Sequence, residues 1–265
     1  MDRPVTFQPN RIREKMKSGK LIAGSVISTM HPGMMHAAAF AGLDFIRIDA
    51  EHQWVRDERM EFVIQTAVNH GVCPIVRVDR DDHYMPRKIL ELGAGGIIFP
   101  QMRTVEDVVR SVRTTKFPPR GIRGYSSICW SGGWGAKSGA DWVKWCDTEP
   151  LVGIMIESVE TESCLEEMIA VDGVDFVLFG QADYSMSLGF GRPNTNHPDV
   201  QGALKKTIAA ARKHGRSVMM GFGTSNEDIL KYSEMGVTML ELDHDIGITR
   251  AVWSDRVDFI ESLQR

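Results

Sequence analysis

The feature that most constrains the fold is a regular alternation of short apolar runs with helical patterns. Eight apolar runs, rich in β-branched residues, lie at 21–28, 44–49, 74–79, 96–100, 151–157, 174–180, 216–222 and 237–243. Helical patterns separate most of them, for instance at 57–70, 104–115, 161–170 and 200–214. Repeated βα units predict a parallel sheet covered by helices, and eight units suit the ~250 residues of a (β/α)8 TIM barrel. We therefore predict one α/β domain over residues 1–265, closed as a barrel.

Two local patterns add detail to this prediction. Thr104 and Thr224 each stand three residues before an acid, a spacing typical of helix N-termini. The segment 117–147, between the fourth and fifth runs, is rich in Gly, Trp and Ser. A loop of this length on a compact barrel is usually functional or disordered. We expect either a surface excursion that packs on a neighbouring subunit or a lid over the active site, with Arg123 in contact with an anion.

Composition excludes several classes of function. The formal net charge is -4 and no block of Lys or Arg follows the chain, which argues against a nucleic-acid partner. No apolar run approaches the ~18 residues that cross a bilayer, and the N-terminus carries no apolar signal core. A cytoplasmic protein without a membrane partner is expected. The four cysteines lack CxxC spacing, so neither a disulfide framework nor a zinc site is indicated.

Two of the apolar runs end at carboxylates. The run LVGIMIES ends on Glu157, and GVDFVLFGQADYS carries Asp183 just past its run. Carboxyl ends of parallel strands meet at one end of a barrel, so these side chains should face each other. Without a cation they would repel, whereas a divalent ion such as Mg²⁺, Mn²⁺ or Co²⁺ keeps both ionised. The alternative is that each carboxylate forms a salt bridge with a nearby arginine.

Further polar residues are expected at the same end of the barrel. The second run continues as FIRIDAEHQW and the third as PIVRVD, which places Asp49, Glu51, His52 and Arg77 near strand ends. A lone Arg or His is usually only solvated, but convergence at one barrel end favours a functional site. A 2-keto acid would chelate the metal through two oxygens, and the guanidinium of Arg77 would stabilise the enolate formed from it.

A family resemblance rests on six motifs taken together and in this order along the chain: FIRIDAEH, PIVRV, ELGAGGIIFPQMRTVEDV, FPPRGIRGY, GIMIESVE and GVDFVLFGQADYSMSLG. From about residue 22 to 252, the chain resembles the class II, metal-dependent pyruvate aldolases of the 2,4-dihydroxyhept-2-enedioate (4-hydroxy-2-oxo-heptanedioate) aldolase family. That family belongs to the phosphoenolpyruvate/pyruvate-domain superfamily, together with proteins like the citrate lyase β subunit. Its fold is a (β/α)8 barrel whose last helix packs on a neighbouring barrel, and its dimers assemble into hexamers.

The resemblance also implies roles for individual residues. It implies that Glu157 and Asp183 bind the metal ion and that Arg77 stabilises the enolate. A pair formed by His52 and Asp49 would transfer protons through water. The backbone N–H groups of Ala182 and Asp183 would hold the substrate carboxylate. The implied reaction is reversible cleavage of a 4-hydroxy-2-keto acid to pyruvate and an aldehyde, with oxaloacetate decarboxylation as a side activity.

The chain departs from the family pattern at several positions. Met155 stands where the family commonly has Gln, Gln181 and Ala182 stand where Pro-Ala is usual, and Glu91 stands where Asp is often found. None of these changes removes a metal ligand or Arg77, but they leave the aldehyde substrate open. Three other readings also stay open: a CoA-ester lyase of the citrate lyase β type, a decarboxylase resembling macrophomate synthase, and a non-catalytic barrel that binds a keto acid.

Overall fold

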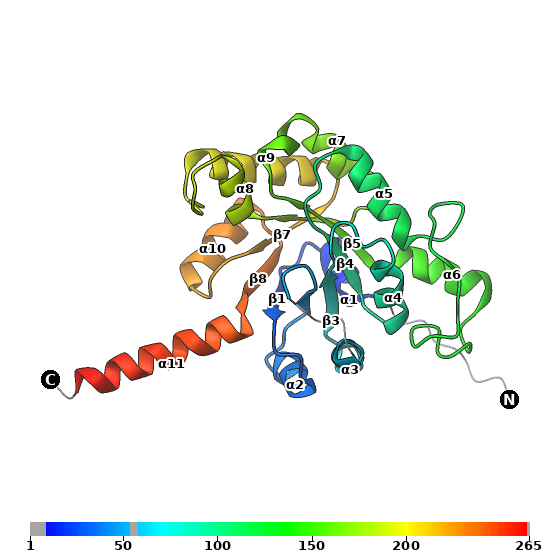
Figure 1. Cartoon of the computed structure of the whole chain (residues 1–265), viewed down its shortest axis with the longest axis horizontal. Helices are drawn as coiled ribbons and strands as arrows, with labels where there is room; N and C mark the ends of the chain where they lie inside the picture. Colours follow the sequence, from blue (N-terminus) through cyan, green and yellow to red (C-terminus); the bar gives the residue numbers. More distant parts are fainter. Residues whose placement is uncertain (1–8, 54–57, 264–265) are drawn as a thin grey trace.

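The computed structural model describes residues 9–53 and 58–263, and its centre is a closed barrel of eight parallel strands (Figure 1). Consecutive strands pair along the chain, and the last pairs with the first. The strands are β1 (Ile22–Ile27), β2 (Phe45–Asp49), β3 (Cys73–Arg77), β4 (Gly96–Phe99), β5 (Leu151–Ile156), β6 (Phe176–Phe179), β7 (Ser217–Gly221) and β8 (Met239–His244). All eight predicted runs, and the predicted (β/α)8 barrel, are confirmed.

Helices lie outside the barrel, in agreement with the predicted βα units. They are α1 (Arg11–Lys17), α2 (Pro32–Phe40), α3 (Glu58–Asn69), α4 (Met85–Leu92), α5 (Val105–Thr115), α6 (Gly139–Thr148), α7 (Leu165–Ala170), α8 (Gln181–Ser187), α9 (Pro198–Lys213), α10 (Asn226–Met235) and α11 (Asp245–Ser262), with a 3-10 helix η1 at Val159–Ser163. The predicted helix at 57–70 corresponds to α3, although residue 57 lies outside the described residues. The division of the chain into a single domain stays a prediction.

Two local predictions need correction. The predicted helix 161–170 is instead the 3-10 turn η1 followed by α7, because the backbone of Cys164 is not helical. The N-terminus predicted at Thr224 lies one residue later, where the Ser225 side chain accepts the Asp228 N–H. The capping box at Thr104 is confirmed, since its hydroxyl accepts the N–H of Asp107. The position at Thr224 was ambiguous because Thr224 and Ser225 each stand three residues before an acid, Glu227 and Asp228.

The interior of the barrel is filled by complementary small and large residues. Gly24 pairs in register with Phe45, and Gly153 pairs with Phe176. A Cβ on either glycine would lie within 2.4 Å of the facing phenyl ring, so the rings occupy space that only a glycine leaves free. Ile12 of α1 packs into the same apolar cluster. The lower part of the barrel is therefore closed, and the carboxyl ends of the strands, here called the mouth, remain for chemistry.

The Gly- and Trp-rich segment 117–147 lies at the amino ends of the strands. Its Trp130 ring packs on Gly93, just before β4, and the Ser131 N–H bonds to the carbonyl of Glu91. The segment follows α5, which runs back from the mouth along the outside of the barrel. The chain has therefore returned to the end opposite the mouth when the segment begins. The interpretation of this segment as a lid over its own active site is thus wrong. Arg123 is buried over the Phe117 ring and does not line the mouth, so its predicted anion contact there is also wrong.

Candidate active site at the barrel mouth

Arg77 and Asp49 form the best-defined contact at the mouth. They are the last residues of β3 and β2 and stand directly opposite each other in the strand register. Arg77 Nε donates to Asp49 Oδ1 at 3.0 Å and Nη2 donates to Oδ2 at 2.5 Å. Burial acts to raise the pKa of Asp49, but these bonds, with the charges of Arg77 and Arg47, hold that pKa below its usual value. Asp49 is therefore ionised, and it fixes the plane of the guanidinium.

Glu51 and His52 continue from Asp49 into the mouth. Asp49 Oδ1 accepts their backbone N–H groups at 3.1 and 3.3 Å, so it shapes this turn as well. Arg77 Nη1 lies 3.1 Å from Glu51 Oε2. His52 was predicted to pair with Asp49, but its ring lies beside Glu51, with 3.8 Å between Nε2 and Oε2. The ring is largely exposed, whereas the Asp49 carboxylate is bonded to Arg77. The hydrogen bond between the two residues comes from the backbone N–H of His52.

Glu157 follows β5 and is buried at the mouth. The neighbouring strand end is Gly180, where a Cβ would lie 2.8 Å from the Glu157 Cβ. Gln101, which sequence reasoning missed, donates its backbone N–H to Glu157 Oε1 and its side-chain amide to Glu51 Oε1. It adopts a left-handed conformation with φ of 54° just after β4. A non-glycine residue in this conformation is uncommon, and no pattern in the sequence marked it.

Asp183 and Glu157 line one hollow of about 200 Å³, which we call the carboxylate hollow. Its other lining residues are Glu51, His52, Gln101, Arg103, Ser158 and Ser187. Burial, together with the charges of Glu51 and Asp183, raises the pKa of Glu157 to about 7 against the opposing effects of the Gln101 N–H and Arg77. Among residues 9–53 and 58–263, no arginine or lysine forms an ion pair with Glu157 or Asp183. This disfavours the salt-bridge alternative for the two carboxylates.

The chemistry of the carboxylate hollow fits a hard divalent cation. Glu157 and Asp183 supply carboxylate oxygens, which Mg²⁺ and Mn²⁺ prefer, and the raised pKa of Glu157 shows that its negative charge is poorly stabilised within the described part of the chain. In the part of the chain that the structure describes, no three His, Cys, Asp or Glu side chains are grouped to hold a metal. The sequence predicted two protein carboxylates as metal ligands. With two protein ligands, several coordination positions of the ion stay open for a substrate and water.

A larger central cavity of about 380 Å³ adjoins the carboxylate hollow at Asp183. It extends from the backbone of Gln181 and Ala182 past Arg77 to a charged pair, Arg47 and Glu241. Met155, at the position where the family commonly has Gln, places its sulfur 3.7 Å from Arg77 Nη1. The two hollows bring together every predicted site residue except Asp49, which lies behind Arg77. Arg47 and Glu241 had not been predicted.

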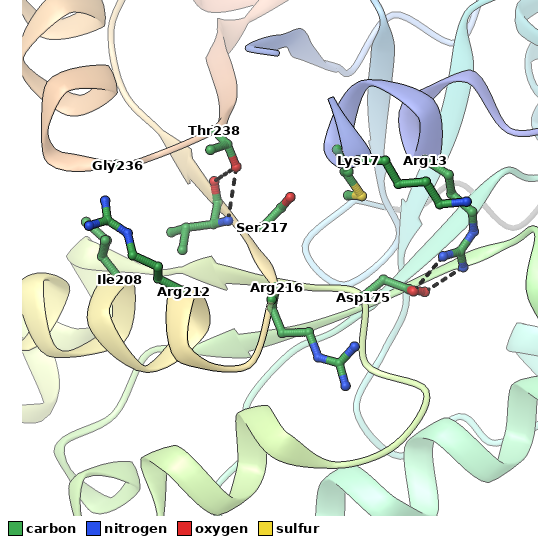
Figure 2. A pocket seen from close by; sticks show the side chains of 12 residues that line it. Arg13, Lys17, Asp175, Ile208, Arg212, Arg216, Ser217, Gly236 and Thr238 are labelled. Atoms are coloured by element: carbon green, nitrogen blue, oxygen red, sulfur yellow. Dashed lines mark hydrogen bonds and ion pairs between the residues drawn. The ribbon is translucent and has the colours of Figure 1, made fainter. Parts of the chain in front are cut away.

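Another cavity lies at the amino end of the barrel, between α1 and the loop from α9 to β7 (Figure 2). Its volume is about 480 Å³, and basic side chains contribute much of its lining. Arg13 forms an ion pair with Asp175 at 2.7 Å, while the guanidinium groups of Arg212 and Arg216 point apart. The cavity contains none of the predicted site residues and no pair of carboxylates. The mouth is therefore the candidate active site.

Comparison with known proteins agrees with this geometry. The model of the HpcH/HpaI aldolase/citrate lyase family matches residues 25–250. The chain belongs to this family. Its members are named for reactions that break a carbon–carbon bond, and this chain is a carbon–carbon lyase with the fold and mouth described above. The family resemblance predicted from the sequence is confirmed.

Named relatives narrow the chemistry further. A hydroxypyruvate/pyruvate aldolase of Pseudomonas aeruginosa is 27% identical over 94% of this chain and 90% of its own length. A 4-hydroxy-2-oxo-heptane-1,7-dioate aldolase of Salmonella dublin is 28% identical over 89% of each chain. The crystal structure of an HpcH/HpaI aldolase from Desulfitobacterium hafniense DCB-2 superposes with a TM-score of 0.87 at 26% identity, over 94% of this chain and 96% of that one.

The raised pKa of Glu157 makes the stability of the metal-free protein depend on pH. The folded carboxyl, with a pKa of about 7, binds its proton more tightly than a model carboxyl of 4.5. Stability is therefore lost as pH rises from about 4.5 through about 7. Between about pH 5 and 8 in EDTA, the free energy of unfolding of wild type should fall by at most about 2–3 kcal/mol more than that of Glu157→Gln. Urea unfolding measures this difference, and equal losses in the two proteins would contradict it.

Proposed function

We propose that this protein catalyses the reversible, metal-dependent cleavage of a 4-hydroxy-2-keto acid to pyruvate and an aldehyde. The observation that carries this function is the guanidinium of Arg77, fixed by Asp49, near two carboxylates that form no ion pair with an arginine or lysine among the described residues. Aldol cleavage leaves negative charge on an enolate oxygen, which a rigid cation can stabilise. The aldolases among the relatives support the same reaction class.

Glu157 and Asp183 would hold the divalent ion, whether Mg²⁺, Mn²⁺ or Co²⁺. When bound, this ion would polarise the ketone of the keto acid. The backbone N–H groups of Ala182 and Asp183 lie in the first turn of α8, where they have no carbonyl partner within the helix. We infer that they bind the substrate carboxylate, so that the keto acid lies between α8 and Arg77.

Arg77 would stabilise the enolate oxygen. Asp49 and Glu51 hold its guanidinium in a fixed position. Asp49 bonds to two of its nitrogens, and Glu51 lies beside the third. The guanidinium thus enters the reaction already oriented, with little reorganisation when negative charge develops. His52, exposed at the rim, would take the proton of the C4 hydroxyl through water, and Asp49 would support it through the turn that it shapes.

The same enolate arises when oxaloacetate loses its carboxylate, so decarboxylation is an expected side activity. Three alternative functions would appear as other outcomes of a substrate test. They are cleavage of a CoA ester, decarboxylation like that of macrophomate synthase, and binding of a keto acid without catalysis. A cytoplasmic location stays a prediction. No helix among the described residues is long and apolar enough to cross a membrane.

The last helix supports assembly into an oligomer built from dimers, as the hexamers of the resembling family suggest. The carboxylate of Asp245 anchors the start of α11 to the N–H groups of Ser28 and Thr29, and the helix then runs away from the barrel (Figure 1). Apolar side chains are exposed along it, including Val252, Trp253, Val257, Phe259 and Ile260. Such a surface needs a covering partner. Light scattering measures the assembly, and a monomeric mass would contradict this proposal.

Removing Arg77 tests the proposed chemistry. Arg77→Ala should lower kcat for cleavage of 4-hydroxy-2-oxo-heptane-1,7-dioate by about 10²-fold or more, because one preorganised donor to the enolate is lost. Arg77→Lys should recover part of the rate, since a point charge does not replace a planar fork. Pyruvate release, followed with lactate dehydrogenase, measures kcat. Arg212→Ala, at the other end of the barrel, is the control. A kcat near that of wild type in Arg77→Ala would refute the role of Arg77.

A further inference from the structure

The cavity at the amino end of the barrel, between α1 and the loop from α9 to β7, has no part in the chemistry proposed for the mouth (Figure 2). Its volume of about 480 Å³ is within the range of ~300 to 1,000 Å³ that is typical of small-molecule sites. One side of the cavity is formed by α1, and the other by the end of α9 and the amino ends of β7 and β8. We call it the amino-end cavity.

The lining of the amino-end cavity carries an excess of positive charge. Its basic residues are Arg13, Lys17, Arg212 and Arg216, and the acid among its described lining residues is Asp175. Arg13 donates to both carboxylate oxygens of Asp175, at 2.7 and 2.8 Å, so these two charges cancel. Lys17, Arg212 and Arg216 form no ion pair among residues 9–53 and 58–263. Three positive charges therefore line the cavity without a counter-charge from the described part of the chain.

A shortage of acids does not explain these unpaired charges. The chain has 35 acidic residues against 31 basic ones. On α1, Lys15 forms an ion pair with Asp44, and on α9, Lys213 forms one with Glu166. Neither of these lysines lines the cavity. A concave surface that carries charge of one sign focuses its electric field and attracts ions of the opposite sign. The amino-end cavity is therefore suited to an anionic ligand.

The positions of the cations indicate the shape of this ligand. Lys17 belongs to the last turn of α1 and Arg212 to the last turn of α9. In the view of Figure 2 they lie on opposite sides of the cavity, with Ser217 of β7 between them. Arg212 Nη2 lies over the turn before β8, where a Cβ on Gly236 would be 3.2 Å from it. A single small anion cannot contact both cations in this arrangement, whereas an elongated ligand with an anionic group at each end can.

The number of charges indicates the chemical class. A phosphate ester carries about 1.5 to 2 negative charges at pH 7, and a carboxylate adds one more. Together they balance the three unpaired cations. Arginine and lysine both bind phosphate and carboxylate oxygens. Met16, Ile208 and Val218 also line the cavity, and they would contact the carbon chain between the two anionic groups.

We propose that the amino-end cavity binds a small metabolite that carries a phosphate ester at one end and a carboxylate at the other. The ligand lies across Ser217, with its two anionic ends at Arg212 and Lys17. Arg216 adds to the positive potential of the cavity. The site is at the end of the barrel opposite Arg77, and it does not depend on the proposed aldolase function.

Calorimetric titration of the EDTA-treated, dialysed protein tests the site with two matched probes. The first probe, 3-phosphoglycerate, carries a phosphate ester and a carboxylate. The second, glycerol 3-phosphate, has a hydroxymethyl group in place of that carboxylate on the same three-carbon chain. Wild type should bind one 3-phosphoglycerate per chain, at least about 5-fold more tightly than glycerol 3-phosphate, because the second probe lacks one charged contact. EDTA removes any metal ion at the mouth that could bind the carboxylate.

Five variants locate the bound probe. Lys17→Met and Arg212→Met each remove one cation but keep an unbranched apolar side chain, and each should weaken 3-phosphoglycerate binding by at least about 5-fold. Lys15→Met and Lys213→Met are the matched controls, because they remove one positive charge from the same two helices outside the cavity. Both should bind like wild type. Arg77→Ala should also bind like wild type, since Arg77 lies at the mouth.

Each contrary outcome overturns the proposal. If 3-phosphoglycerate gives no heat of binding at millimolar concentrations, the site is refuted. Equal affinities for the two probes would refute a ligand with two anionic ends. If Arg77→Ala loses binding while Lys17→Met and Arg212→Met retain it, the anion binds at the mouth and the amino-end site is refuted. None of these results bears on the aldolase function, which the kcat of Arg77→Ala tests separately.

Discussion

The charge balance at the mouth is the constraint on which the site depends. Arg77 is bonded to Asp49 on one side and lies beside Glu51 on the other. Asp49 and Glu51 therefore largely compensate its positive charge, and little of it remains to stabilise Glu157 and Asp183. Burial and like charges then raise the pKa of Glu157 to about 7, which means that ionising this carboxyl is costly in the protein alone. A divalent cation in the carboxylate hollow would remove that cost, and it would also activate the substrate.

The barrel produces this arrangement through its register and its closure. Parallel pairing sets Asp49 opposite Arg77, while the close approach of β5 and β6 at Gly180 brings the backbone of one strand against the carboxylate of the other. The glycine and phenylalanine pairs fill the lower interior, and α1 closes the amino end. The mouth is thus a rigid rim above a packed core. A loose core would let the guanidinium of Arg77 rotate away from the enolate oxygen and so reduce its effect.

Much of this structure could be predicted because its signals are local. Each strand is a short apolar run, and Glu157 and Asp183 stand at or just after the ends of such runs. The position of Gln101 could not be predicted, since it depends on a left-handed backbone conformation with no sequence signature. Arg47 and Glu241 are 194 residues apart and meet only because β8 closes the barrel against β1. The lid interpretation of 117–147 failed because the segment directly follows α5, a helix that the sequence did predict at 104–115, and the chain leaves such a helix at the amino end of the strands.

Calorimetric titration of the EDTA-treated, dialysed protein with Mn²⁺ tests the central claim most directly. Wild type should bind one ion per chain, and both Glu157→Gln and Asp183→Asn should lose most of that affinity while the barrel stays folded. Glu160→Gln is the matched control, because Glu160 is an exposed carboxylate nearby that already pairs with Arg103 at 3.4 Å. Its affinity should equal that of wild type. Unchanged Mn²⁺ affinity in both Glu157→Gln and Asp183→Asn would show that the mouth carboxylates do not hold the metal.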